Sequence, residues 1–204
     1  MTSLIHAATC YAILLGISVS LPAAASDLKS TWPQWRGPDR DGHAAAIPVW
    51  PDQLTEQAMA EKWRVELGPS YSGPIVTNDR VFVTETRDKK TEVVQALSRA
   101  DGKVLWTAEW PDAMSVPFFA GANGDWIRAT PAYDGESLFV AGMRDLLVCL
   151  NAETGEERWR VDFVERFKSA LPNFGFVSSP LVDRELPGPY ASMRVTRAPR
   201  SRRW

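Results

Sequence analysis

A polar turn followed by a tryptophan occurs twice in this chain. The segment LSRADGKVLWT at 97–107 aligns with LNAETGEERWR at 150–160, so that Gly102 matches Gly155 and Trp106 matches Trp159 53 residues later. Asp101-Gly102 and Thr154-Gly155 supply the turn chemistry that links two short strands. A chain with this feature must build the same structural unit more than once.

The match extends upstream of each tryptophan. Residues 73–85 align with 130–142, and residues 93–110 align with 147–163. In each copy a proline opens a short apolar strand, a polar turn follows, and three further apolar stretches alternate with a period of two residues, which favours strands over helices. Each unit is therefore predicted to be four antiparallel strands.

Partial copies flank the two complete ones. EKWRVELG at 61–68, with Trp63, is predicted to be the fourth strand of a preceding unit, and VSSPLVD at 177–183 the start of a following one. Four-stranded units that repeat at roughly 40 to 50 residues are typical of a β-propeller, whose blades stack around a central channel. We expect an all-β fold, an incomplete propeller of two full blades plus partial blades. The nine tryptophans favour a packing role, in which Trp63, Trp106 and Trp159 fill the space between adjacent blades.

These segments resemble a known family. SGPIVTNDRVFV, ALSRADGKVLW and CLNAETGEERW are similar to the repeats of PQQ-like (pyrroloquinoline quinone type) β-propellers, which include quinoprotein alcohol dehydrogenases and the propeller subunit of the outer-membrane assembly machinery. WPQWRGPDRDG and AMSVPFFAGANGDWIRATPAYDG resemble more closely a group of exported bacterial proteins described only by that repeat. The resemblance covers roughly 32–183. It implies a non-catalytic scaffold or a ligand- or protein-binding module of the cell envelope; the alternatives are part of a quinoprotein (PQQ-dependent) oxidoreductase and an outer-membrane assembly factor-like propeller.

The first 25 residues contain no Lys, Arg, Asp or Glu, and the apolar run at 11–21 is followed by Ala23-Ala24-Ala25 before Ser26. This pattern is that of a signal peptide over 1–25, and the run is too short for a permanent membrane anchor. Export to the periplasm or cell envelope is expected. The domain plan continues with an amino-terminal segment at 26–60, which Trp32 and Trp35 are expected to pin onto the repeats, and with the propeller repeats at 61–183.

Residues 184–204 differ in composition from the rest, with six arginines and one acidic residue. The repeat is expected to stop at Asp183, and a frameshifted or truncated copy explains the change. The alternative is a native basic tail that binds phosphate or a membrane surface. Propellers have about four to eight blades, so two complete units are too few for a closed ring, and association with a second copy or a missing half is expected.

The resemblance also implies what a quinone enzyme would need: a tryptophan floor, a calcium ion held by carboxylate and amide oxygens, an aspartate base and a disulfide between neighbouring cysteines. Signal removal takes Cys10 and leaves Cys149, which is interpreted as a buried thiol. The acidic loop at 38–42 fails as an EF-hand, because Gly37 and Pro48 would occupy its first and twelfth positions. No catalytic, cofactor or metal residue is therefore predicted, and PQQ with calcium remains the alternative. No nucleic-acid motif is present, so the expected partner is a protein or a small ligand.

The connections that enter the innermost strands are the best candidates for a binding surface, since such loops surround the channel mouth on one propeller face. Two of them, 115–130 and 171–179, are rich in aromatic residues. The candidate residues are Phe118, Phe119, Asn123, Asp125, Trp126, Arg128, Phe174 and Phe176. The alternative is that the aromatic rings plug the channel and that Arg128 pairs with an acid such as Asp125.

Overall fold

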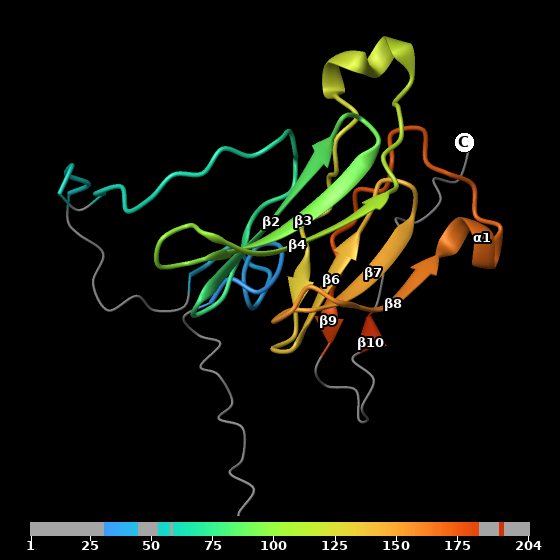
Figure 1. The fold of residues 1–204 in the computed structure, drawn as a ribbon. Coiled ribbons are helices and arrows are strands. Elements are labelled where there is room, and N and C mark those ends of the chain that lie inside the picture. The colour runs from blue at the N-terminus through green and yellow to red at the C-terminus, as the bar shows by residue number, and fades with distance from the viewer. Residues whose placement is uncertain (1–30, 45–52, 58, 184–191, 194–204) are drawn as a thin grey trace, which may run out of the picture.

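The computed structural model describes residues 31–44, 53–57, 59–183 and 192–193, and its main features are two four-stranded antiparallel sheets (Figure 1). The first blade consists of β1 (Ile75–Val76), β2 (Arg80–Arg87), β3 (Thr91–Ser98) and β4 (Val104–Pro111), paired in that order. The second consists of β5 (Ala132–Tyr133), β6 (Ser137–Ala141), β7 (Leu146–Asn151) and β8 (Glu157–Asp162), also in sequence order. The predicted all-β propeller architecture with two complete blades is confirmed.

The two blades repeat their irregularities as well as their strands. The pairing register shifts between Ala96 and Leu97 in the first blade and between Cys149 and Leu150 at the equivalent place in the second. In each turn the glycine has a positive φ, 73° at Gly102 and 78° at Gly155. The amide of each glycine donates to the carbonyl four residues earlier at 2.8 Å. A residue with a side chain is strained at such φ values, so glycine at this turn position follows from the backbone path.

The structure differs from the sequence predictions outside the two blades. No strand is present at 61–68, where a fourth strand of a preceding unit was expected, and that prediction is wrong. The start of a third unit is present as β9 (Val182–Asp183), but it pairs antiparallel with β10 (Ser192–Met193), a short strand inside the region expected to lie beyond the repeat. The sequence also did not indicate α1 (Phe163–Phe167), which begins where the Asp162 side chain accepts from the amide of Glu165 at 2.8 Å.

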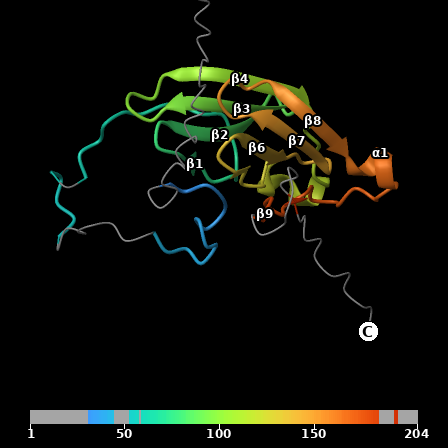
Figure 2. The same ribbon diagram turned by 90° about the horizontal axis from the view of Figure 1, so that it is seen from below.

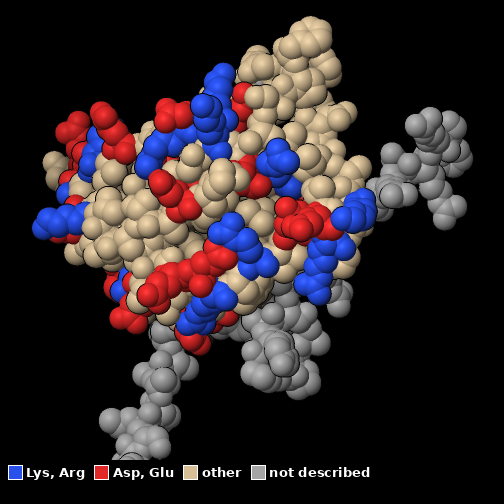
Figure 3. Space-filling model, turned by 45° about the vertical axis from the view of Figure 1, so that its right-hand side comes forward, with Lys and Arg blue, Asp and Glu red and all other residues tan. Residues whose placement is uncertain are grey.

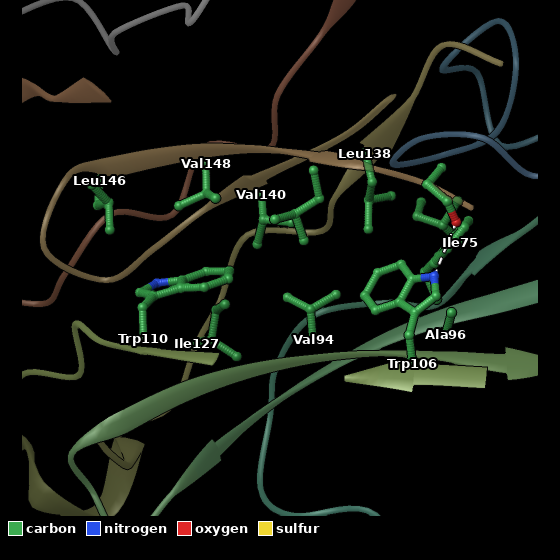
Figure 4. Close-up of a cluster of buried hydrophobic side chains, with 13 residues drawn as sticks. Ile75, Val94, Ala96, Trp106, Trp110, Ile127, Leu138, Val140, Leu146 and Val148 are labelled. Atoms are coloured by element: carbon green, nitrogen blue, oxygen red, sulfur yellow. Dashed lines mark hydrogen bonds between the residues drawn. The ribbon is translucent and has the colours of Figure 1, made fainter. Parts of the chain in front are cut away.

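The main hydrophobic core lies between the two sheets, which are stacked face to face (Figures 2 and 4). Trp106 and Trp110 of β4 point from the first blade toward the second, where Leu138, Val140 and Val148 face them. All five side chains are buried. Neither sheet has enough apolar partners of its own, so each blade folds by covering its neighbour.

Trp106 makes the key contact between the blades. Its indole Nε1 donates to the carbonyl of Ala152 at 3.1 Å, and its ring lies so close to Gly155 that a Cβ there would stand 2.7 Å from ring atoms. Trp63 makes the same contact with the first blade: its Nε1 donates to the carbonyl of Arg99 at 2.9 Å, and its ring lies against Gly102. Trp63 therefore takes the position of a fourth-strand tryptophan although its segment is not a strand.

Trp159 shares only part of this arrangement. Its ring lies 6.0 Å from that of Phe139 in its own sheet, as the Trp106 ring lies 5.7 Å from that of Phe82. The Trp159 side chain is nevertheless 41% exposed, against 9% for Trp106. The outer face of the second blade is therefore open around Trp159 in the part of the chain that the structure describes.

The amino-terminal segment runs along the inner strands. The backbone of Trp32 exchanges two hydrogen bonds with Val76 of β1, at 2.7 and 3.0 Å, and the carbonyl of Pro33 accepts from Tyr133 of β5 at 2.8 Å. The ring of Trp35 is half exposed and has the guanidinium groups of Arg36 and Arg40 over it. The segment thus contacts both blades through its backbone.

Candidate binding surface

Three exposed phenylalanines from two separate connections come together at one end of the molecule. Phe118 and Phe119 lie in a 3-10 helix, η2 (Phe118–Asn123), and are 95% and 71% exposed; Phe174 is 45% exposed. The rings of Phe118 and Phe119 are 5.7 Å apart and those of Phe119 and Phe174 are 6.4 Å apart, each pair edge to face. We call these three residues the phenylalanine patch.

The 3-10 helix η2, which carries Phe118 and Phe119, projects from the sheets (Figure 1). The sequence of η2, FFAGAN, has no charged residue, and the projecting tip shows neither blue nor red in the charge-coloured view, whereas acidic and basic groups cover the adjacent surface (Figure 3). Exposed aromatic rings on an uncharged projection are unfavourable in water, and they are typical of surfaces that become buried against a partner.

Buried contacts hold the projection in place. Val116 and Ala120 pack against Met143, which lies in the turn between β6 and β7 and is fully buried. The amide of Val116 donates to the Asp125 carboxylate at 2.7 Å, closing the base of the loop. Because the base of the loop is already packed, the loop loses little conformational entropy when a partner binds to the exposed rings. A small entropy cost favours affinity.

Arg128 connects the two loops that carry the patch. Its Nη2 donates to the carbonyl of Gly124 at 2.8 Å, and its Nε donates to the carbonyl of Phe174 at 3.1 Å. The same guanidinium lies 5.0 Å from the centre of the Tyr71 ring. Arg128 was predicted as a surface residue of the 115–130 loop, and its side chain reaches from that loop to the 171–179 loop.

The other predicted surface residues have different positions. Phe176 is partly buried beside Ala129 and Leu147, and its amide donates to the carbonyl of Met143 at 2.9 Å. The ring of Trp126 lies 5.2 Å from that of Tyr71. Asp125 lies 3.9 Å from the Lys89 ammonium in addition to its bond with Val116, and Asn123 ends η2.

A buried pair of carboxyl groups at the blade interface was not anticipated from the sequence. Glu92 of β3 is fully buried and accepts from Trp110 Nε1 at 3.2 Å and from the amide of Met143 at 2.7 Å. Burial and the nearby Asp112 raise the pKa of Glu92 to about 8, and burial raises the pKa of Asp112 to about 6. A side chain at Gly142 would meet both carboxyl groups. The signal in the sequence was an acid directly before the apolar pair Val93-Val94 of β3.

Comparison with known proteins agrees with this architecture. Residues 89–187 match a family model described as outer membrane protein assembly factor BamB, of the PQQ-like repeat type. Two solved structures resemble the chain at a TM-score of 0.52 and 18% identity. The quinohemoprotein alcohol dehydrogenase ADHIIG from Pseudomonas putida HK5 matches over 76% of this chain, and the quinohemoprotein alcohol dehydrogenase from Comamonas testosteroni over 79%.

Residues 89–187 carry PQQ-like β-propeller repeats.

The chain spans less than a quarter of those two dehydrogenases, 22% and 23% of their lengths. BamB from Moraxella catarrhalis matches at 21% identity and a TM-score of 0.38, over 48% of this chain and 27% of that one. No curated protein sequence matches. At these identities the likeness to solved structures shows the propeller fold.

In the described ranges, no group of three or more His, Cys, Asp or Glu side chains is placed to hold a metal ion. The acidic loop predicted to be a turn has the Asp41 carboxylate bound to the backbone and ring of His43, at 2.8 and 3.0 Å. Cys149 is a free, buried thiol whose pKa burial raises. Within the same ranges, no helix has the length and apolar character needed to cross a membrane.

Proposed function

We propose that this PQQ-like propeller chain is an exported, non-catalytic protein-binding module of the cell envelope, and that its phenylalanine patch is the docking surface. The observation that carries the proposal is the meeting of Phe118, Phe119 and Phe174, three exposed rings from two loops that Arg128 joins. Aromatic side chains are enriched among the residues that supply most of the binding energy of protein interfaces.

The shape of the patch favours a protein over a small ligand. Small molecules bind in hollows that bury most of their surface. The rings of Phe118 and Phe119 stand on a projection, with 95% and 71% of their surface in solvent. A projecting, uncharged aromatic group fits into an apolar groove of a partner protein.

The family match supports a protein partner. The model matched by residues 89–187 is that of an assembly factor for outer-membrane proteins, a role fulfilled by contact with other proteins. The signal-like residues 1–25, which lie outside the described residues, support export, and an exported chain would meet its partner in the periplasm or cell envelope. Mass spectrometry of the protein from its native host should find a mature chain beginning at Ser26, and an intact amino terminus would contradict export by this route.

Photo-crosslinking in the native host tests the docking surface. A photoreactive phenylalanine analogue replaces Phe118 in one strain, and in a control strain it replaces Phe167, which is 61% exposed on α1 and outside the patch. We expect a discrete adduct with one envelope protein from position 118 and none from position 167. Phe119→Ser or Phe174→Ser should remove the adduct.

Equal adducts from the two positions, or none from position 118, would contradict the proposal. So would an adduct that survives both serine substitutions. Circular dichroism and the urea midpoint of each variant show whether the blades still fold, and no large change is expected because the Phe119 and Phe174 side chains are exposed.

A calorimetric titration with calcium and PQQ tests the non-catalytic part of the proposal. We expect no tight complex with the purified chain. Binding near nanomolar affinity would instead favour a quinoprotein oxidoreductase.

A further inference from the structure

A pocket of about 350 Å³ lies between the amino-terminal segment and the entry to the second blade. Its walls come from four stretches that are distant in sequence, including Arg40, Tyr71, Arg128 and Ser179. The volume is near the lower end of the range for small-molecule sites. We call it the two-arginine pocket, after Arg40 and Arg128.

The lining of this pocket is rich in positive charge. Arg40 and Arg128 both contribute to it, and none of the described residues that line it is an aspartate or glutamate. Arg40 Nη1 donates to the carbonyl of Pro180 at 3.2 Å, and its guanidinium lies 5.4 Å from the Trp35 ring centre. These contacts hold the guanidinium in position without neutralising its charge.

Two hydroxyl groups of the pocket are oriented by the backbone. Thr130 Oγ1 accepts from the amide of Gly73 at 3.0 Å, and Ser179 Oγ accepts from the amide of Thr130 at 3.1 Å. Each hydroxyl oxygen accepts a hydrogen bond from a backbone amide, and its O–H hydrogen can still be donated to a ligand. The pocket thus combines two cationic donors with two hydroxyl donors.

The half-exposed rings of Trp35 and Tyr71 form apolar walls beside the charges. Charge-assisted hydrogen bonds from guanidinium to carboxylate or phosphate oxygens are stronger than neutral ones, and apolar walls reduce the competition from water. We propose that the two-arginine pocket binds a small oxyanion, a carboxylate or phosphate group that accepts from Arg40, Arg128 and the two hydroxyls. This pocket shares Arg128 with the phenylalanine patch, but it binds a small anion and not a protein, so calorimetry with small anions tests it separately.

Isothermal titration calorimetry with the full chain tests the site. Inorganic phosphate and succinate are the two probes, and sodium chloride at matched ionic strength is the control for general screening. We expect saturable binding of one probe at millimolar affinity or tighter, and the tighter probe identifies the oxyanion. Saturable binding of neither probe would overturn the proposal.

Arg40→Gln should weaken binding at least tenfold. Arg36→Gln is the matched control, because Arg36 also lies over the Trp35 ring, at 5.6 Å, but does not line the pocket. Ser178→Glu keeps both arginines and adds a carboxylate to the pocket wall, so it should abolish binding even if Arg40→Gln folds poorly. Equal affinities in the Arg40→Gln and Arg36→Gln variants, or unchanged affinity in Ser178→Glu, would contradict the site.

Discussion

The indole of Trp106 in the first blade donates a hydrogen bond to the carbonyl of Ala152 in the second, at 3.1 Å. Ala152 stands three residues before Gly155, against which the indole ring packs. Trp63 has the same relation to Arg99 and Gly102. One tryptophan and one turn therefore form a repeating joint between successive units, and the joint combines apolar burial with a satisfied indole donor.

Removing Trp106 should destabilise the chain far more than removing Trp159. Trp106→Ala leaves a cavity between the sheets and is expected to lower the free energy of unfolding by about 3–5 kcal/mol. Trp159 is 41% exposed, so Trp159→Ala should cost roughly 1 kcal/mol. Urea unfolding followed by circular dichroism measures both, and similar losses in the two variants would contradict a joint specific to the blade interface.

Gly155→Ala should disrupt the same joint from the other side. The new Cβ would meet the Trp106 ring at 2.7 Å and would sit on a backbone with a φ of 78°. Gly135→Ala is the matched control, because Gly135 also has a positive φ, 114°, but no atom within 4 Å of the Cβ position. We expect about 1 kcal/mol from strain alone in the control and roughly 2–4 kcal/mol in Gly155→Ala. Equal thermal midpoints for the two variants would show that the ring contact contributes nothing.

Stability should fall as pH rises through the range in which Glu92 ionises. Its folded pKa is about 8, above the ordinary value of 4.5, so the native state keeps a proton that the unfolded chain has released. This contribution to the free energy of unfolding is complete below about pH 4.5 and is lost as pH rises through about 8. The total loss is several kcal/mol at most. Asp112, with a folded pKa of about 6, contributes in the same direction at lower pH.

Glu92→Gln isolates this contribution. Urea midpoints at pH 6.5 and 8.5 should differ in the unmodified chain and differ less in Glu92→Gln, since glutamine does not ionise. The variant should also be less stable at acidic pH, because its amide cannot accept from both Trp110 and Met143. Glu61 forms an exposed ion pair with Arg64, and Glu61→Gln is the control. Its urea midpoint should change between pH 6.5 and 8.5 as much as that of the unmodified chain. If the urea midpoint of Glu92→Gln changed with pH as much as that of the unmodified chain, Glu92 would not be the source of the pH dependence.

Regular local patterns were sufficient to predict the two blades. Alternating apolar residues, the Asp-Gly and Thr-Gly turns and the prolines before β1 and β5 all act over a few residues, and strand position depends on such short-range signals. The segment at 61–68 shows the limit of this reasoning. Its alternation resembles β4, but a strand needs a hydrogen-bonded neighbouring strand, and no strand among the described residues pairs with it.

The candidate sites depended on contacts that no short pattern encodes. Phe118, Phe119 and Phe176 are all aromatic residues of the predicted loops, yet packing buries part of Phe176 beside β7 and leaves the other two in solvent. Arg40 and Arg128 meet in one pocket because the amino-terminal segment crosses both inner strands. Residue propensity and periodicity along the chain were thus enough to predict the four-stranded blades and the turns within them. The stacking of one blade on the next, a sum of long-range burial and hydrogen bonding, settled which side chains face water, which carboxyl groups are buried and which distant residues share a site.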